Sequence, residues 1–205
     1  MSSILFLASK SPQRQALLQE IQIPFVLLEQ DANEHACDWG LPFMQLLESI
    51  ATYKMDHVIL PVGKQDETIF VLTADTMGQD LHGTIHGKPR NKEDALAKIK
   101  ALRAGGSVAT AFCLDKKIYN NGNWQLQQRI IRCVETFYTF DMPDHWIERY
   151  LNAEPHYLHI SGAIDVTGYG QQFLKTLHGS YSTIIGLPLF ELRQSLEEIG
   201  FIIQR

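Results

Sequence analysis

Apolar and polar residues alternate in blocks along the first part of the chain, and each block has the length of one strand or one helix. An apolar run over 4–7 predicts a buried strand, and the polar turn after it leads into a helix that begins at Pro12 with Ser11 as its N-cap. A second apolar run over 25–28 predicts another strand. Residues 42–58 have apolar side chains at helical spacing. This alternation predicts an α/β fold.

The rest of the chain continues the alternation with longer elements. Residues 69–72 read as a buried strand, and the turn residues of 81–85 predict the tip of a hairpin. The other predicted elements are a helix capped by Asn91, two strands within 107–140 joined at an Asn-Gly turn, a helix over 143–151, a strand over 173–177, a helix over 188–199 and a terminal strand over 201–203. We therefore expect one domain over residues 1–205, with a mixed, partly antiparallel sheet and flanking helices.

Composition and charge exclude several classes of protein. A chain of 205 residues, 45% hydrophobic, buries a proper core. Its net charge of -5 argues against a nucleic-acid polymer as partner, because neutralising a phosphate backbone needs clustered Lys and Arg. No apolar stretch approaches the roughly 18 residues of a membrane span, so we expect a cytoplasmic protein with no membrane partner. Cys37, Cys113 and Cys133 are far apart, which fits a reducing compartment and small apolar roles.

The turn before the first helix carries candidate phosphate ligands. Backbone N–H groups at a helix start have no partner within the helix, and the helix dipole adds positive charge, so a phosphate binds there readily. Ser9 and Ser11 lie at this turn, and Arg14 is placed to hold phosphate oxygens in a bidentate fork. The alternative is an ordinary capped helix with Arg14 in solvent.

Two acids and two lysines are candidates for binding a divalent cation and a polyphosphate. Asp75 follows a buried strand, where open α/β sheets place ligands; it is a candidate for holding a divalent cation or taking a proton from water, with a turn cap as the alternative. Glu34, in a polar loop, is a solvated acid alone and a magnesium ligand if it meets Asp75. Lys54 lies on the apolar stripe of 42–58, so its amine must snorkel or meet an anion. Lys88 has a plain solvent-facing alternative.

A series of short motifs extends over nearly the whole chain. They are Leu7-Ala8-Ser9-x-Ser11-Pro12-x-Arg14-x-x-Leu17-Leu18, Asn33-Glu34, Ala51-x-x-Lys54, Ala74-Asp75-Thr76, Gly87-Lys88-Pro89 and Gly179-Ser180-Tyr181-Ser182 with Gly186-Leu187-Pro188. In order and spacing they resemble the signature of the Maf family of nucleoside triphosphate pyrophosphatases. The resemblance implies a Maf/ITPase-like mixed-sheet fold with two lobes around a cleft. It also implies a homodimer, a divalent metal cation (Mg²⁺, Mn²⁺ or Co²⁺) and cleavage of a nucleoside triphosphate to the monophosphate and pyrophosphate.

The same resemblance assigns roles to residues of this chain. Asp75 is implied as the proton acceptor, and Glu34 as a partner of the metal or of the attacking water. The implied contacts to the triphosphate are Ser9, Arg14, Lys54 and Lys88, and Lys54 and Lys88 are also candidate catalytic residues. Ser11 and Thr76 are further candidate substrate-binding residues. A triphosphate carries about four negative charges, which one divalent cation and three basic side chains would offset.

Three positions depart from the family's motifs. Gln13 stands where members acting on dTTP and UTP carry Arg and where the 7-methyl-GTP branch carries an aromatic residue. Ile160 replaces a lysine, and Thr167 replaces the glutamine that sets base preference. Gln13 and Thr167 are therefore candidate substrate-binding positions for a different or modified base. Two hypotheses follow: a pyrophosphatase that clears unwanted nucleotides from the pool, or a catalytically weakened nucleotide-binding regulator linked to cell-division arrest.

Overall fold

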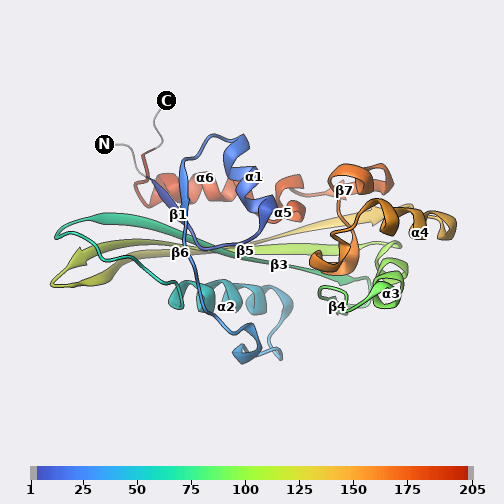
Figure 1. Ribbon diagram of the computed structural model, residues 1–205, viewed down its shortest axis with the longest axis horizontal. Helices are drawn as coiled ribbons and strands as arrows, with labels where there is room; N and C mark the ends of the chain where they lie inside the picture. Colours follow the sequence, from blue (N-terminus) through green and yellow to red (C-terminus); the bar gives the residue numbers. More distant parts are fainter. Residues whose placement is uncertain (1–3, 203–205) are drawn as a thin grey trace. The chain divides into compact units, whose positions relative to one another are not determined.

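The computed structural model describes residues 4–202 and contains a seven-stranded mixed sheet with the strand order β2-β1-β3-β5-β6-β7, in which β4 also pairs with β3 (Figure 1). The strands are β1 (Leu5–Leu7), β2 (Phe25–Leu27), β3 (Thr68–Asp80), β4 (Ile85–His86), β5 (Gly106–Asn120), β6 (Asn123–Phe140) and β7 (Leu174–His178). The helices are α1 (Pro12–Glu20), α2 (Phe43–Asp56), α3 (Lys92–Leu102), α4 (Asp144–Ala153), α5 (Tyr181–Ile185) and α6 (Leu189–Glu198). The predicted α/β class with a mixed sheet is confirmed.

The described chain divides into two compact units, and β3, β5 and β6 contribute residues to both. The first unit contains residues 4–75, 111–134 and 186–202. The second contains residues 76–110 and 135–185. Asp75 is thus the last residue of β3 in the first unit.

In the first unit, β1 is the central parallel strand. Leu5 of β1 is in register with Phe25 of β2 and with Phe70 of β3, and both pairings are parallel. Figure 1 shows α1 and α6 on one side of these strands and α2 on the other. Because both faces are covered, β1 reads as a continuous apolar run rather than as an alternating pattern.

The start of α1 agrees with the sequence prediction. Ser11 is the N-cap, and its hydroxyl oxygen accepts a hydrogen bond from Arg14 N, while Pro12 is the first helical residue. The buried stripe of α1 consists of Arg14, Leu17 and Leu18. An arginine therefore takes a position that an apolar side chain would fill in an ordinary amphipathic helix.

In the second unit, the predicted hairpin at 81–85 is present and is tied by one acid. Gln79 of β3 pairs with Ile85 of β4 in antiparallel register. The Asp80 carboxylate accepts hydrogen bonds from the backbone N–H groups of His82 and Thr84 and lies 2.8 Å from His86 Nε2. The His86 hydrogen bond, opposed by burial and helped by the backbone donors, lowers the pKa of Asp80 to about 2.

One predicted strand boundary is wrong. The strand predicted over 69–72 continues to Asp80, so Asp75 lies within β3 rather than at its carboxyl end. The ladder continues because β4 and β5 pair with β3, whereas the short β1 is in register only with 70–72.

The predicted terminal strand is also wrong where it can be judged: residues 201 and 202 are not in a strand, and Ile203 lies outside the described residues. The chain instead closes α6. Gly200 has a φ of 80°, and Phe201 N donates to Leu196 O, the bonding pattern of a Schellman cap. The Phe201 ring then packs edge-on against Phe70 at a centroid distance of 5.2 Å. This contact explains why the segment after α6 is apolar although it forms no strand at residues 201 and 202.

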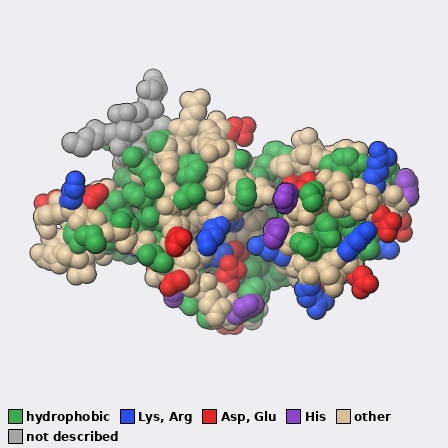
Figure 2. Space-filling model, viewed as in Figure 1, with side chains coloured by type: hydrophobic (Ala, Val, Ile, Leu, Met, Phe, Trp, Pro, Cys, Tyr) green, Lys and Arg blue, Asp and Glu red, His purple; other side chains and the backbone are tan. Residues whose placement is uncertain are grey.

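On the face seen in Figure 2, acidic and basic side chains are interspersed rather than gathered into one patch. Among residues 4–202, no helix combines the length and the hydrophobicity needed to cross a bilayer.

Candidate active site

Three charged side chains of the first unit meet at one point. Lys54 Nζ lies 2.5 Å from Asp75 Oδ1 and 2.8 Å from Glu34 Oε1. The Lys54 and Asp75 side chains are only 9% and 10% exposed, while that of Glu34 is 43% exposed. The lysine on the apolar stripe thus meets two anions. We call Glu34, Lys54 and Asp75 the charged cluster.

Each member of the charged cluster is delivered by a different element. The buried stripe of α2 includes Ile50 and Ala51, and Lys54 follows Ile50 by four residues, so its stem lies on the same stripe. Asp75 belongs to β3, and Glu34 opens a short 3₁₀ turn in which the Asn33 side chain accepts a hydrogen bond from His35 N. The cluster therefore depends on tertiary packing of helix, strand and turn.

Arg14 is buried beside the charged cluster. Its Nε donates to Gly186 O at 2.8 Å, and its Nη1 donates to Ser9 Oγ at 3.2 Å. Burial lowers the pKa of the Arg14 guanidinium, and the negative charges of Asp75 and Glu34 oppose that shift. The alternative of a solvated Arg14 is wrong, because the structure holds this cation in the electrostatic field of both acids.

The other candidates at the first turn form a local hydrogen-bonded set. Ser9 Oγ accepts from Ser11 N at 3.3 Å, and Ser11 Oγ donates to Gln13 Oε1 at 3.2 Å. These contacts order the turn that holds Arg14. Gln13 is half-buried and bonds within its own turn.

Three further candidates, Thr76, Lys88 and Thr167, belong to the second unit. Thr76 Oγ1 lies 2.8 Å from Thr110 Oγ1, and Thr110 donates its one hydroxyl hydrogen to Thr183 O, so Thr76 is the donor in this pair. The Lys88 side chain is exposed, and its carbonyl oxygen accepts a hydrogen bond from Lys98 Nζ at 2.9 Å.

Thr167 is bound to a neighbouring acid. Its backbone N and its Oγ1 both donate to Asp165 Oδ1, each at 2.7 Å. The buried side chain of Tyr150 holds the loop that carries Thr167, because its hydroxyl donates to Ala163 O and accepts from Asp165 N. The hydroxyl hydrogen of Thr167 is therefore already used within this loop.

The charged cluster fits a hard divalent cation. Asp75 Oδ2 is buried and has no hydrogen-bond partner among residues 4–202, whereas Oδ1 is held by Lys54. A buried carboxylate oxygen without a partner is costly, and a cation is one group that satisfies it. The described residues contain no group of three or more His, Cys, Asp or Glu side chains suited to a metal. Two carboxylates nevertheless suffice for Mg²⁺, which takes its other ligands from water and substrate phosphates.

Cys37 is a neighbour of the charged cluster that no sequence pattern indicates. Burial and the negative charge of Glu34 raise the pKa of the Cys37 thiol, Lys54 opposes this, and Asp75 adds to it. Cys37 N donates to Glu34 O at 3.2 Å, at the end of the turn that carries Glu34. The sequence shows only that it lies three residues from Glu34. A raised pKa favours the thiol, so this cysteine is a weak nucleophile.

Comparisons with known proteins give a consistent result. A family model described as Maf-like protein matches residues 4–199. The chain is 32% identical over 198 residues to a dTTP/UTP pyrophosphatase of Xanthomonas euvesicatoria, covering 96% of this chain and 99% of that protein. It is 31% identical over 207 residues to a dTTP/UTP pyrophosphatase of Colwellia psychrerythraea, with coverages of 98% and 91%. A nucleoside triphosphate pyrophosphatase of Trichormus variabilis is 30% identical over 198 residues, with coverages of 95% and 93%.

Proposed function

Because this chain belongs to the Maf-like protein family, we propose that it is a nucleoside triphosphate pyrophosphatase, a hydrolase that releases pyrophosphate and a nucleoside monophosphate. Three relatives that it matches over almost their full length carry that activity in their names. The observation that carries the proposal for this chain is the convergence of Glu34, Lys54 and Asp75 on one point, with Arg14 buried beside them.

In the proposed reaction, water attacks the α-phosphorus, a new phosphorus–oxygen bond forms, and the bond from the α-phosphorus to the bridging oxygen breaks. Pyrophosphate leaves with that oxygen. The Asp75 carboxylate, which Lys54 holds through Oδ1, accepts the proton of the water. Phosphoryl transfer asks little covalent chemistry of a protein, so the positioning of these groups and the neutralisation of charge carry the catalysis.

The basic side chains supply the charge that a triphosphate needs. Arg14 offers the planar fork suited to phosphate oxygens, and Lys54 offers a point charge next to Asp75, the proposed general base. Ser9 and Ser11 order the turn that holds Arg14, and we propose Lys88 and Thr76 as further contacts to the substrate.

Glu34 and Asp75 are the residues that would hold a divalent cation. When bound, such a cation supplies neutralisation of the phosphate charge and polarisation of a phosphoryl oxygen. We propose Mg²⁺ because both protein ligands are carboxylates, with Mn²⁺ and Co²⁺ as the cations to compare.

The base preference is proposed to differ from that of the dTTP/UTP relatives. Gln13 Oε1 accepts a hydrogen bond within its own turn, and the hydroxyl hydrogen of Thr167 is donated to Asp165. Thr167 has no amide group, so it cannot make the paired contact that a glutamine at position 167 would make to a base edge. We propose a role in clearing an unwanted or modified nucleotide from the cytoplasmic pool. We also propose a homodimer, which light scattering of the purified protein tests.

The experiment for the proposed function is a substrate panel. Ordinary and modified nucleoside triphosphates are incubated with the protein and Mg²⁺, Mn²⁺ or Co²⁺, and pyrophosphate, phosphate and monophosphate are quantified. Release of pyrophosphate and monophosphate in equal amounts from at least one triphosphate supports the proposal. Tight binding of a triphosphate without any release supports the regulatory alternative, and release of phosphate with diphosphate contradicts the assigned bond cleavage.

A further inference from the structure

A buried hydroxyl links the strand of the acid to the helix of the lysine. Thr73 is fully buried, at 0% exposure, and its Oγ1 donates to Ala51 O at 2.7 Å. Thr73 precedes Asp75 by two residues on β3, and Ala51 precedes Lys54 by three residues on α2. The hydrogen bond therefore joins the same strand and the same helix as the ion pair between Asp75 and Lys54, two residues away on β3 and three residues away on α2.

The hydrogen bond of Thr73 and the ion pair of Lys54 with Asp75 join the same faces of β3 and α2. Side chains two residues apart in a strand point to the same face, so Thr73 and Asp75 both face α2. Residues three apart in a helix share a side, so Ala51 and Lys54 both face β3. Two strand residues advance about 6.6 Å and three helix residues about 4.5 Å, a mismatch of roughly 2 Å that the flexible lysine stem covers.

The rest of the stripe that α2 presents to the sheet is apolar. Leu46, Leu47 and Ile50 are each at 0% exposure, and burial of such side chains is not directional. Apolar packing fixes the register of a helix less sharply than a directional hydrogen bond does. At the C-terminal end of α2, Arg129 Nη2 donates a hydrogen bond to Asp56 Oδ1 at 2.7 Å, at an exposed position. The Thr73 bond is directional, short and buried, so it selects one register.

A buried threonine fills the core less favourably than an apolar residue of the same shape. A valine has the same shape without a polar atom to satisfy, and a buried hydroxyl adds stability only while its hydrogen bond is made. The hydroxyl at position 73 is thus explained by the contact it makes to α2.

We propose that Thr73 is a positioning residue for hydrolysis: its hydrogen bond to Ala51 O fixes the register of α2 on β3 at which Lys54 Nζ meets Asp75 Oδ1. The inference rests on the proposed function for the roles of Lys54 and Asp75 in the reaction. Its structural part, the coupling of position 73 to the ion pair, stands apart from any activity.

The test compares Thr73→Val, which keeps the shape, with Thr73→Ser, which keeps the hydroxyl. Misplacement of a catalytic group by about 1 Å costs up to 100-fold, so Thr73→Val is expected to lower kcat at least tenfold. The KM for the triphosphate should change by a smaller factor than kcat, because the phosphate contacts of Arg14 are untouched. Thr73→Ser should recover most of kcat. If Thr73→Val does not fold, Thr73→Ala takes its place.

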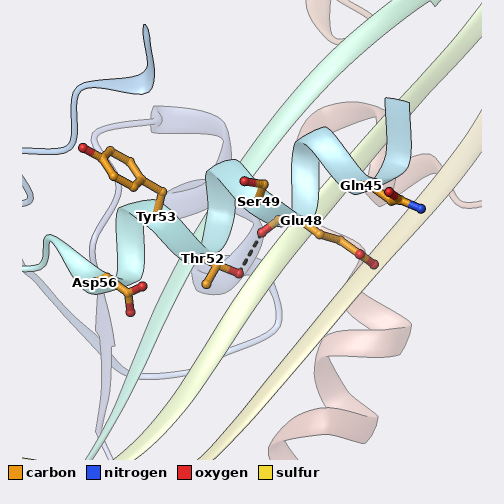
Figure 3. Close-up of a pocket in the computed structure, with 6 residues that line it drawn as sticks. All are labelled: Gln45, Glu48, Ser49, Thr52, Tyr53 and Asp56. Carbon is orange, nitrogen blue, oxygen red and sulfur yellow. Dashed lines mark hydrogen bonds between the residues drawn. The ribbon is translucent and has the colours of Figure 1, made fainter. Parts of the chain in front are cut away.

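Thr52 supplies the matched control. Its Oγ1 donates to Glu48 O, also at 2.7 Å, so it is a threonine-to-helix-carbonyl bond on the same helix. Figure 3 shows this bond on the polar side of α2, among Gln45, Ser49, Tyr53 and Asp56, which line an open pocket. Because this bond stays within α2, Thr52→Val should leave kcat unchanged.

A double-mutant cycle with Lys54→Met separates positioning from general destabilisation. In the Lys54→Met background, Thr73→Val should change kcat less than twofold and lower the melting temperature less than it does in the wild type. Equal effects in both backgrounds, or wild-type kcat in Thr73→Val, would overturn the inference. The melting-temperature cycle needs no substrate, so it decides the coupling even if the wild type hydrolyses no triphosphate, which would defeat the proposed function alone.

Discussion

Replacing Lys54 with methionine removes the ammonium that pairs with a buried carboxylate while keeping an apolar stem on α2. The Asp75 side chain is 10% exposed, so its charge stays out of water when its partner is lost. Removing one partner of a buried pair costs about 3–5 kcal/mol. We expect the low end, about 3 kcal/mol, because Arg14 still places positive charge near Asp75. The contact to Glu34, 43% exposed, adds at most about 1 kcal/mol.

The assay is thermal unfolding, supported by urea unfolding. For a chain of this size, each kcal/mol lowers the melting temperature by about 2–4 °C, so Lys54→Met should melt about 6–12 °C below the wild type. The double variant Lys54→Met with Asp75→Asn removes the stranded charge and should recover most of the loss. Lys100→Met, at an exposed position of α3, is the control for loss of a lysine and should change little.

Two results would refute this reasoning. One is a Lys54→Met protein within about 1 kcal/mol of the wild type, far below the cost of stranding a buried charge. The other is full additivity of Lys54→Met and Asp75→Asn. Either result would mean that the ion pair with Lys54 does not stabilise the buried Asp75 carboxylate.

Three further variants test other parts of the structure. Arg14→Met should raise the KM for the triphosphate about tenfold or more in steady-state kinetics, since a charge-assisted hydrogen bond is lost. Asp80→Asn should be less stable than the wild type at neutral pH in urea unfolding. That gap should narrow as the pH falls from about 4 toward 2, because the pKa of Asp80 is about 2 in the folded state and near 3.9 unfolded. Gly170→Ala places a Cβ 1.7 Å from Asp165 O and should lower the melting temperature by several degrees, while Gly87→Ala, whose Cβ meets nothing within 4 Å, should not.

Local signals predict the start of α1 and the unusual position of Lys54. The cap at Ser11 and the proline after it involve residues adjacent in the chain, so the sequence is enough to place them. The apolar stripe of α2 likewise shows that the Lys54 amine needs an anion or water.

Features that depend on distant pairing are beyond such signals. The length of β3 is set by its pairing with β4 and β5, so the sequence alone ends this strand too early and misplaces Asp75 at its end. The family resemblance and the chemistry of the two carboxylates suggest that Glu34 and Asp75 share a site, and no periodicity indicates it. The partner of the Thr73 hydroxyl is a backbone carbonyl, and every residue has one, so no pattern of side chains identifies it.

The most direct test of the account is pyrophosphate release by the Asp75→Asn protein, measured on the triphosphate that the wild type hydrolyses best. Asparagine keeps the shape of the side chain and cannot take the proton. We predict a fall in turnover of about 100-fold or more, the scale of a lost general base. An Asp75→Asn protein that folds, binds the triphosphate and turns it over at the wild-type rate would contradict the assignment of the charged cluster as the active site.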